Sequence, residues 1–197
     1  LKSCVERKKE IDKEKGKDRI FFIRAKGSNY SISYWVYFEV NAMHNLYHID
    51  RFLRKLWVEC CGHMSAFNIN EDEYLYDIWE PDQYDMDVLI KDVIYPGLEF
   101  TYEYDFGSTT ELDLKCVSER FGKIKGIRIL ARNEPPEFLC DWCEKPAKYV
   151  FTDFYGEYDE FLCELCIQKP ECKDGSILPI VNSPRMGVCG YTGGEDL

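Results

Sequence analysis

Four cysteines in the C-terminal third of the chain have the spacing of a metal site. They form two Cys-x-x-Cys pairs, Cys140 with Cys143 and Cys163 with Cys166, and nineteen residues separate the pairs. A tight turn at each pair can point two sulfurs at one centre, so the two pairs can complete a tetrahedral shell around Zn²⁺. The spacing therefore predicts a structural zinc ribbon, with Zn²⁺ as the cofactor and no open coordination position.

Two other interpretations of these pairs stay open. A redox-active dithiol is one, although the pairs lack the βαβ context of thioredoxin-like proteins. An iron site or cluster is the other, because a four-thiolate shell does not strongly exclude iron.

A second group of candidate ligands follows a predicted helix. It comprises His44, His48, Cys60, Cys61 and His63. These side chains could form a second metal site, or they could be partly buried residues at the helix ends. No His-Glu-x-x-His motif is present, which excludes a zincin-type protease.

Cys189 lies in a glycine-rich tail. An exposed thiol near backbone N–H groups can have a lowered pKa, so Cys189 is a candidate nucleophile, with His48 or His63 as its base. A tail that docks on the protein or stays mobile is the plainer interpretation.

The elements that must position these residues alternate between strand and helix patterns. Residues 30–40 alternate with period two, and residues 46–57 carry an amphipathic stripe. Further strands are predicted at 20–24, 63–69, 100–106, 112–116 and 124–130, with a loop at 70–87 and a short helix at 88–94. This order predicts an α+β fold, with a mostly antiparallel sheet and one main amphipathic helix. A small zinc-ribbon β-hairpin module follows it.

Changes in composition divide the chain into four parts. We expect a charged N-terminal arm at 1–19, the α+β domain at 20–133, the zinc ribbon at 134–175 and a Gly-rich C-terminal tail at 176–197. Two strands of the ribbon are expected at 149–152 and 160–162, where aromatic and β-branched side chains concentrate.

The net charge of −11 makes this an acidic protein. Residues 66–115 hold fourteen acids and two lysines, and residues 134–175 hold eleven acids and four lysines. Such a surface repels phosphate and disfavours nucleic acid as a partner. Basic residues concentrate only at 1–19 and 119–132, which are the segments that nucleic-acid binding would use.

The sequence shows no pattern of a membrane-spanning segment or a secretory signal. No apolar run approaches the ~20 residues that a membrane span requires, and the N-terminus has no apolar stretch of a secretory signal. Ten cysteines without such a signal point to a reducing compartment. We therefore expect a cytoplasmic protein that does not engage a membrane.

The segment Phe100-Thr101-Tyr102-Glu103-Tyr104-Asp105-Phe106-Gly107 resembles the F-x-Y-x-YDFGD hallmark of the Ri-plasmid third-open-reading-frame-like family. Leu46–Ile49, His63–Phe67 and Glu134–Glu137 resemble further motifs of that family, in the same order. The resemblance covers about residues 20–137 and implies an α+β fold and association with mobile elements, without an established reaction. The chain departs from the family at Ser108, Thr110 and Leu112, where the family has Asp, Trp and His.

Together these patterns favour a zinc-stabilised, non-enzymatic interaction or accessory protein that binds a protein partner. The alternatives are a nucleic-acid-associated protein that uses its basic segments, and a thiol-dependent enzyme that uses Cys189.

Overall fold

The computed structural model describes residues 18–79, 83–153 and 159–195. Its contacts divide the chain into two compact units. The first unit holds the chain up to Arg54 together with His63–Asn133, and the second holds Lys55–Gly62 together with Glu134–Leu197. The arm predicted at 1–19 lies outside the described residues up to Lys17, and its last two residues begin the first strand.

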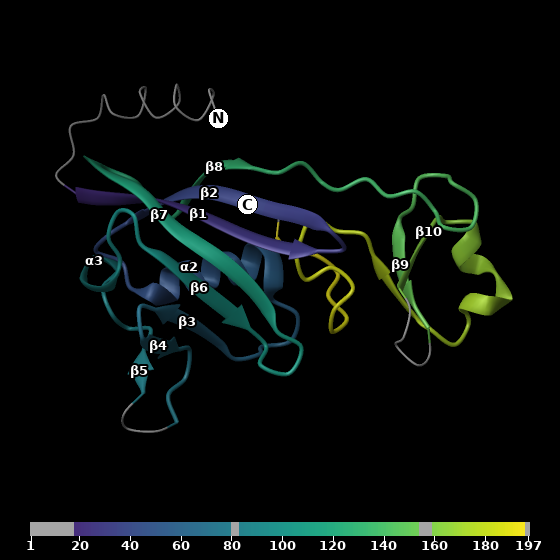
Figure 1. Ribbon diagram of the computed structural model, residues 1–197, viewed down its shortest axis with the longest axis horizontal. Helices are drawn as coiled ribbons and strands as arrows, with labels where there is room; N and C mark the ends of the chain where they lie inside the picture. Colours follow the sequence, from purple (N-terminus) through teal and green to yellow (C-terminus); the bar gives the residue numbers. More distant parts are fainter. Residues whose placement is uncertain (1–17, 80–82, 154–158, 196–197) are drawn as a thin grey trace. The chain divides into compact units, whose positions relative to one another are not determined.

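The first unit is built on an eight-stranded sheet (Figure 1). Its strand order is β5-β4-β3-β6-β7-β1-β2-β8, and every neighbouring pair is antiparallel except β4 with β5. The strands are β1 (Asp18–Asn29), β2 (Ile32–Asn41), β3 (Ser65–Ile69), β4 (Asp72–Leu75), β5 (Tyr84–Asp85), β6 (Glu99–Tyr104), β7 (Thr110–Gly122) and β8 (Arg128–Arg132). The sheet-rich α+β fold expected from the sequence is confirmed.

Among the described residues, the main helix is α2 (Leu46–Leu53), which covers a face of this sheet (Figure 1). The alternation along β2 explains the packing, because Tyr34, Val36, Phe38 and Val40 are all fully buried on one side of the strand. The Phe38 ring lies 4.7 Å from that of Phe52 on the helix. A π-helical turn, η1 (Arg54–Val58), continues α2, and a short helix, α3 (Ile90–Val93), precedes β6.

A buried polar cluster ties α2 to the sheet. The Asp50 carboxylate is fully buried and accepts hydrogen bonds from Arg54 Nε at 2.9 and 3.0 Å. It also accepts hydrogen bonds from Ser65 Oγ on β3, at 2.6 Å, and from the Tyr102 hydroxyl on β6, at 2.9 Å. Arg54 Nη2 donates in turn to the His63 carbonyl and to Ser65 Oγ, both at 2.8 Å. The charge pair therefore connects one helix with two strands.

Two predictions about the first unit are wrong in detail. The segment predicted as a loop at 70–87 contains β4 and β5, which are too short to show a period in the sequence. The strand predicted at 124–130 lies at Arg128–Arg132, because β7 continues to Gly122 and a turn containing Gly126, at φ +60°, follows it.

The second unit contains a three-stranded antiparallel sheet in the order β10-β9-β11. Its strands are β9 (Tyr149–Thr152), β10 (Asp159–Leu162) and β11 (Ser176–Pro179), and two 3₁₀ turns lie between β10 and β11, η2 (Cys166–Gln168) and η3 (Pro170–Cys172). The segment predicted as a Gly-rich tail therefore begins with a strand that pairs with β9. Within the described residues, no helix has the length and apolar character needed to cross a membrane.

Candidate metal centre

The four cysteines of the two Cys-x-x-Cys pairs converge in the second unit. Four sulfur atoms lie within 4.8 Å of one another, those of Cys140, Cys143, Cys163 and Cys166. The Cys143 sulfur is 3.6 Å from that of Cys163 and 3.6 Å from that of Cys166. A tetrahedral ion with Zn–S bonds of ~2.3 Å separates its sulfurs by about 3.8 Å. The group can therefore hold a metal ion.

Two tight turns present these sulfurs. The Cys140 carbonyl accepts hydrogen bonds from the backbone N–H groups of Cys143, at 3.3 Å, and Glu144, at 2.8 Å. Glu144 has a φ of +59°, a left-handed conformation that turns the chain back after the first pair. At the second pair, the Cys163 carbonyl accepts from the N–H of Ile167 at 3.1 Å. Each turn directs the two sulfurs of its pair toward one side.

Backbone N–H groups favour the thiolate form at part of this site. Hydrogen bonds from the N–H groups of Cys166 and Leu165 lower the pKa of the Cys163 thiol to about 6. Burial acts against ionisation of Cys140, yet backbone hydrogen bonds outweigh it and lower the pKa of that thiol as well. Burial and hydrogen bonds with neighbouring thiols raise the pKa of Cys166 to about 12. A bound cation would lower the pKa of Cys166, because its positive charge stabilises the thiolate.

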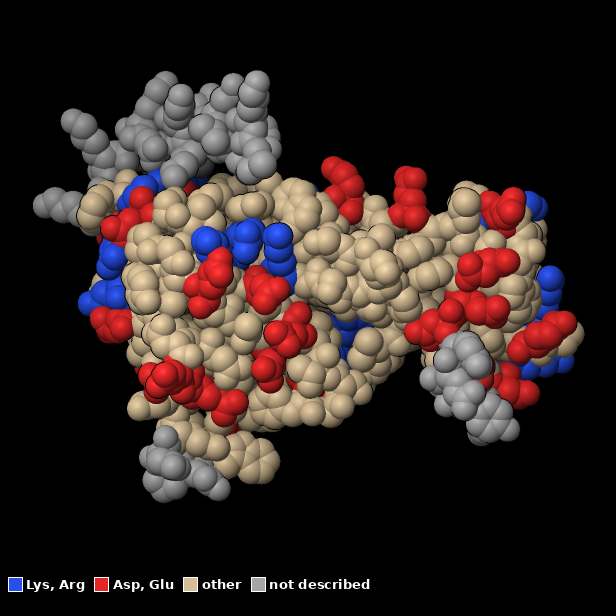
Figure 2. Space-filling model, viewed as in Figure 1, with Lys and Arg blue, Asp and Glu red and all other residues tan. Residues whose placement is uncertain are grey.

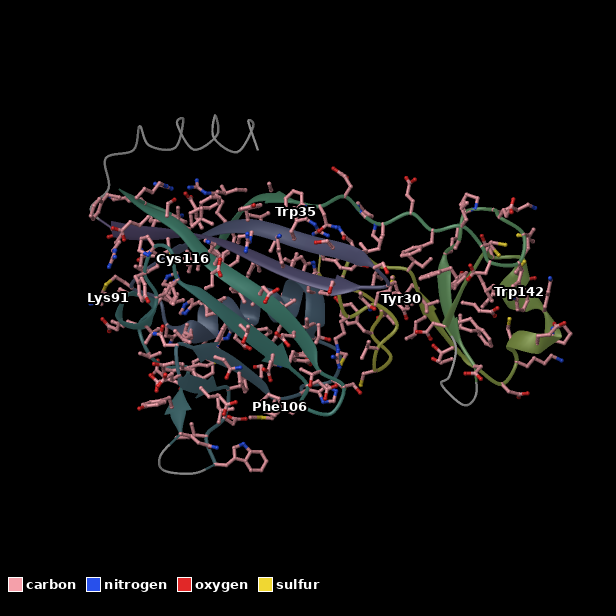
Figure 3. All side chains as sticks on the ribbon, viewed as in Figure 1. Tyr30, Trp35, Lys91, Phe106, Cys116 and Trp142 are labelled. Atoms are coloured by element: carbon pink, nitrogen blue, oxygen red, sulfur yellow. The ribbon has the colours of Figure 1, made fainter. Side chains whose placement is uncertain are left out.

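The apolar surroundings of the site are small. The buried cluster consists of Phe151, Leu162, Cys172 and three of the four candidate ligands. Cys172 is not among the converging sulfurs, and it donates to the Cys166 carbonyl at 3.7 Å. Trp142, labelled in Figure 3, donates from Nε1 to Glu160 at 3.0 Å, and the Lys169 ammonium lies 4.7 Å from its ring centroid. Its ring therefore packs within the unit.

A second thiol group, formed by Cys60, Cys61 and Cys189, also lies in the second unit. The Cys61 sulfur is 3.6 Å from that of Cys60 and 3.9 Å from that of Cys189. The hydrogen bond with Cys60 is the main cause that raises the pKa of Cys61 to about 12. The sequence pointed to Cys60 and Cys61 but not to their meeting with Cys189. Arg185, four residues before Cys189, donates to the Cys60 sulfur, and the sequence pattern did not predict this contact.

The three histidines belong to the first unit. The rings of His44 and His48 stack on each other in the first unit, 4.1 Å apart, and His48 Nδ1 shares a hydrogen bond of 2.6 Å with Asn45 Oδ1. Burial and the neighbouring His48 lower the pKa of His44. His63, also in the first unit, lies 3.5 Å from the Asp105 carboxylate through Nε2. His44 and His48 thus form a pair of their own, separate from His63 and its carboxylate.

Part of the basic segment at 119–132 is engaged in ion pairs. Arg120 donates to both carboxylate oxygens of Glu39, at 2.7 and 2.8 Å, and Arg128 donates to Glu39 at 2.6 Å. Glu39 is almost fully buried. Glu119 pairs with Arg19. These contacts stabilise the sheet and engage two arginines of the basic segment with one buried carboxylate.

Comparison with known proteins adds a likeness in fold. No family model matches the chain, and a search of curated proteins finds no significant match. A solved structure of a protein of unknown function from Methanosarcina mazei Go1, MM3350, is similar with a TM-score of 0.50 and 13% sequence identity. The match covers 58% of this chain and 69% of that one. This likeness supports the fold and carries no statement about activity.

Proposed function

We propose that this chain is a zinc-stabilised, non-enzymatic binding protein, in which Zn²⁺ orders a small module that contacts a protein partner. One observation carries the proposal: the sulfurs of Cys140, Cys143, Cys163 and Cys166 lie within 4.8 Å of one another, and two of their separations, at 3.6 Å, are close to the spacing of about 3.8 Å expected on one zinc ion. The likeness of residues 20–137 to the Ri-plasmid family extends the proposal to an accessory role on a mobile element.

A structural role for the ion fits the composition of its shell. Four cysteine ligands fill all tetrahedral positions, so no position is left for substrate or water. Three of the four sulfurs belong to buried residues, and the surrounding apolar cluster is small. Structural zinc in small finger peptides binds with ~10–16 kcal/mol of apparent free energy, which in such modules is also folding free energy.

The surface of the second unit suggests the chemistry of its partner. Residues 134–175 carry a net charge of −7 by sequence, and Figure 2 shows acidic side chains outnumbering basic ones on the visible face of this unit. Leu139 and Leu165 are exposed to 64% and 63%, and Ile177 is also exposed. Exposed apolar side chains on an acidic unit favour a partner that offers apolar and basic residues. Reduced thiols agree with a cytoplasmic location.

The test combines metal analysis with hydrogen exchange on the full chain. We expect one zinc equivalent that resists a weak chelator and depends on Cys143. Its removal by a strong chelator, or by Cys143→Ser, should abolish amide protection in β9 and β10 while β1, β2, β6 and β7 stay protected. Cys116→Ala, which removes a thiol of the first unit, serves as the control and should keep this zinc. Unchanged protection in β9 and β10 after complete metal removal would refute the proposal.

A further inference from the structure

We propose that Cys60, Cys61 and Cys189 form a second metal site, a solvent-accessible three-thiolate site for a divalent thiophilic ion such as Zn²⁺. It is distinct from the four-cysteine group and belongs to the same unit. Residues 128 positions apart in sequence come together to make it.

The sulfur separations fit coordination to one ion. The distances of 3.6 Å between Cys60 and Cys61 and 3.9 Å between Cys61 and Cys189 bracket the spacing of about 3.8 Å expected for sulfurs on one tetrahedral zinc. A disulfide requires about 2.05 Å, so none of these sulfurs is bonded to another. These separations are similar to the two distances of 3.6 Å in the four-cysteine group.

A buried cation balances the charge of such a site. Arg185 is fully buried, and its Nη2 donates to the Cys60 sulfur at 3.5 Å. A buried guanidinium keeps its positive charge, which favours the thiolate over the thiol next to it. Three thiolates with one divalent ion carry a single negative charge, and Arg185 neutralises it. A fourth thiolate would leave one negative charge that the divalent ion and Arg185 together do not neutralise.

The segment that carries Cys189 is held firmly against the Lys55–Gly62 segment. Ser183 Oγ donates to the Trp57 carbonyl at 2.6 Å, and the Glu195 N–H donates to the Lys55 carbonyl at 2.7 Å. Cys189 itself adopts a left-handed conformation, with a φ of +50°, in a turn flanked by Gly187 and Gly190, which also have positive φ. This anchoring keeps the third sulfur beside the adjacent cysteine pair.

Exposure makes this site different in kind from the first. Cys61 and Cys189 are exposed, and Cys60 is partly exposed. Three thiolates occupy three of the four tetrahedral positions and leave the fourth to a non-thiolate ligand. We therefore expect an ion that exchanges readily, in contrast with the enclosed ion of the four-cysteine group.

The experiment measures zinc per chain for the full-length protein kept under a phosphine reductant, before and after dialysis against a weak chelator. We expect two equivalents before dialysis and one afterwards. Cys61→Ser and Cys189→Ser should each lose the labile equivalent and keep the tight one, whereas Cys143→Ser should lose the tight equivalent and keep the labile one. Cys116→Ala should keep both.

Cobalt substitution supplies a second readout. Thiolate-to-Co²⁺ charge-transfer absorbance should rise in two steps, and Cys61→Ser should remove the weaker step alone. Arg185→Met should weaken Co²⁺ binding at this step by about tenfold or more, as loss of a supporting interaction around a metal site commonly does. A single equivalent in the unsubstituted protein, or two in Cys61→Ser and Cys189→Ser, would overturn the second site while leaving the four-cysteine site intact.

Discussion

Replacing Asp50 with asparagine tests the part of the first unit that joins its helix to its sheet. The change keeps the size of the side chain but removes its negative charge. The Asp50 carboxylate accepts four hydrogen bonds, from Arg54, Ser65 and Tyr102, in a position without solvent access. Arg54 would remain buried, between the rings of Tyr76 and Tyr104 at 4.5 and 4.8 Å, without its counter-charge.

The expected cost follows from this geometry. Removing one partner of a buried ion pair typically destabilises a protein by ~3–5 kcal/mol, because the remaining charge keeps its desolvation penalty. The asparagine amide can still accept from Tyr102 or Ser65, which places the expected loss near the lower end, at about 3 kcal/mol. A double replacement, Asp50→Leu with Arg54→Met, removes both charges and should recover most of that loss.

Urea unfolding followed by tryptophan fluorescence measures the difference, with Asp113→Asn as a control, because Asp113 is an exposed carboxylate on β7 of the same sheet. The control should change the free energy of unfolding by less than about 0.5 kcal/mol. A loss below about 1 kcal/mol for Asp50→Asn, or a double variant less stable than the single one, would refute the reasoning.

Two further outcomes follow from particular contacts. Burial raises the pKa of Glu39, but hydrogen bonds from Arg120 and Arg128 outweigh burial and hold this pKa below its ordinary value of 4.5. The stability that Glu39 contributes is therefore present above pH 4.5 and is lost as the pH falls through the lowered pKa. Acid unfolding curves of Glu39→Gln should lack this component. Gly194→Ala should loosen the C-terminal segment, because the added Cβ would stand 2.4 Å from the Lys55 carbonyl oxygen. Faster alkylation of Cys189 measures this loosening, and Gly107→Ala serves as the control. An unchanged alkylation rate would contradict the predicted clash.

The elements with a strong period could be predicted from the sequence. The alternation in residues 30–40 and the stripe in 46–57 located β2 and α2, since burial of one face imposes a pattern on the residues themselves. β4 could not be predicted in this way. Only Tyr74 and Leu75 of its four residues are buried, so its place in the sheet depends on pairing with β3.

The candidate sites show the same difference between local and long-range information. The Cys-x-x-Cys spacing placed four sulfurs together, because each pair is shaped by one local turn. The group of Cys60, Cys61 and Cys189 depends on how the distant C-terminal tail packs. The spacing of these cysteines in the sequence does not predict that contact. The prediction that zinc is the bound ion stays a prediction.

The two borders of the large sheet leave little room for another chain to add a strand. β5 ends one border and spans only two residues, while β8 ends the other with an arginine at each end. Beyond β8, Asn133 donates its N–H to the Trp35 carbonyl and accepts the Trp35 N–H through its side chain, so this stretch of β2 is paired as well. Short, charged or occupied borders oppose strand-by-strand aggregation. An eight-stranded sheet with such borders therefore has little tendency to recruit a strand from another copy of the chain.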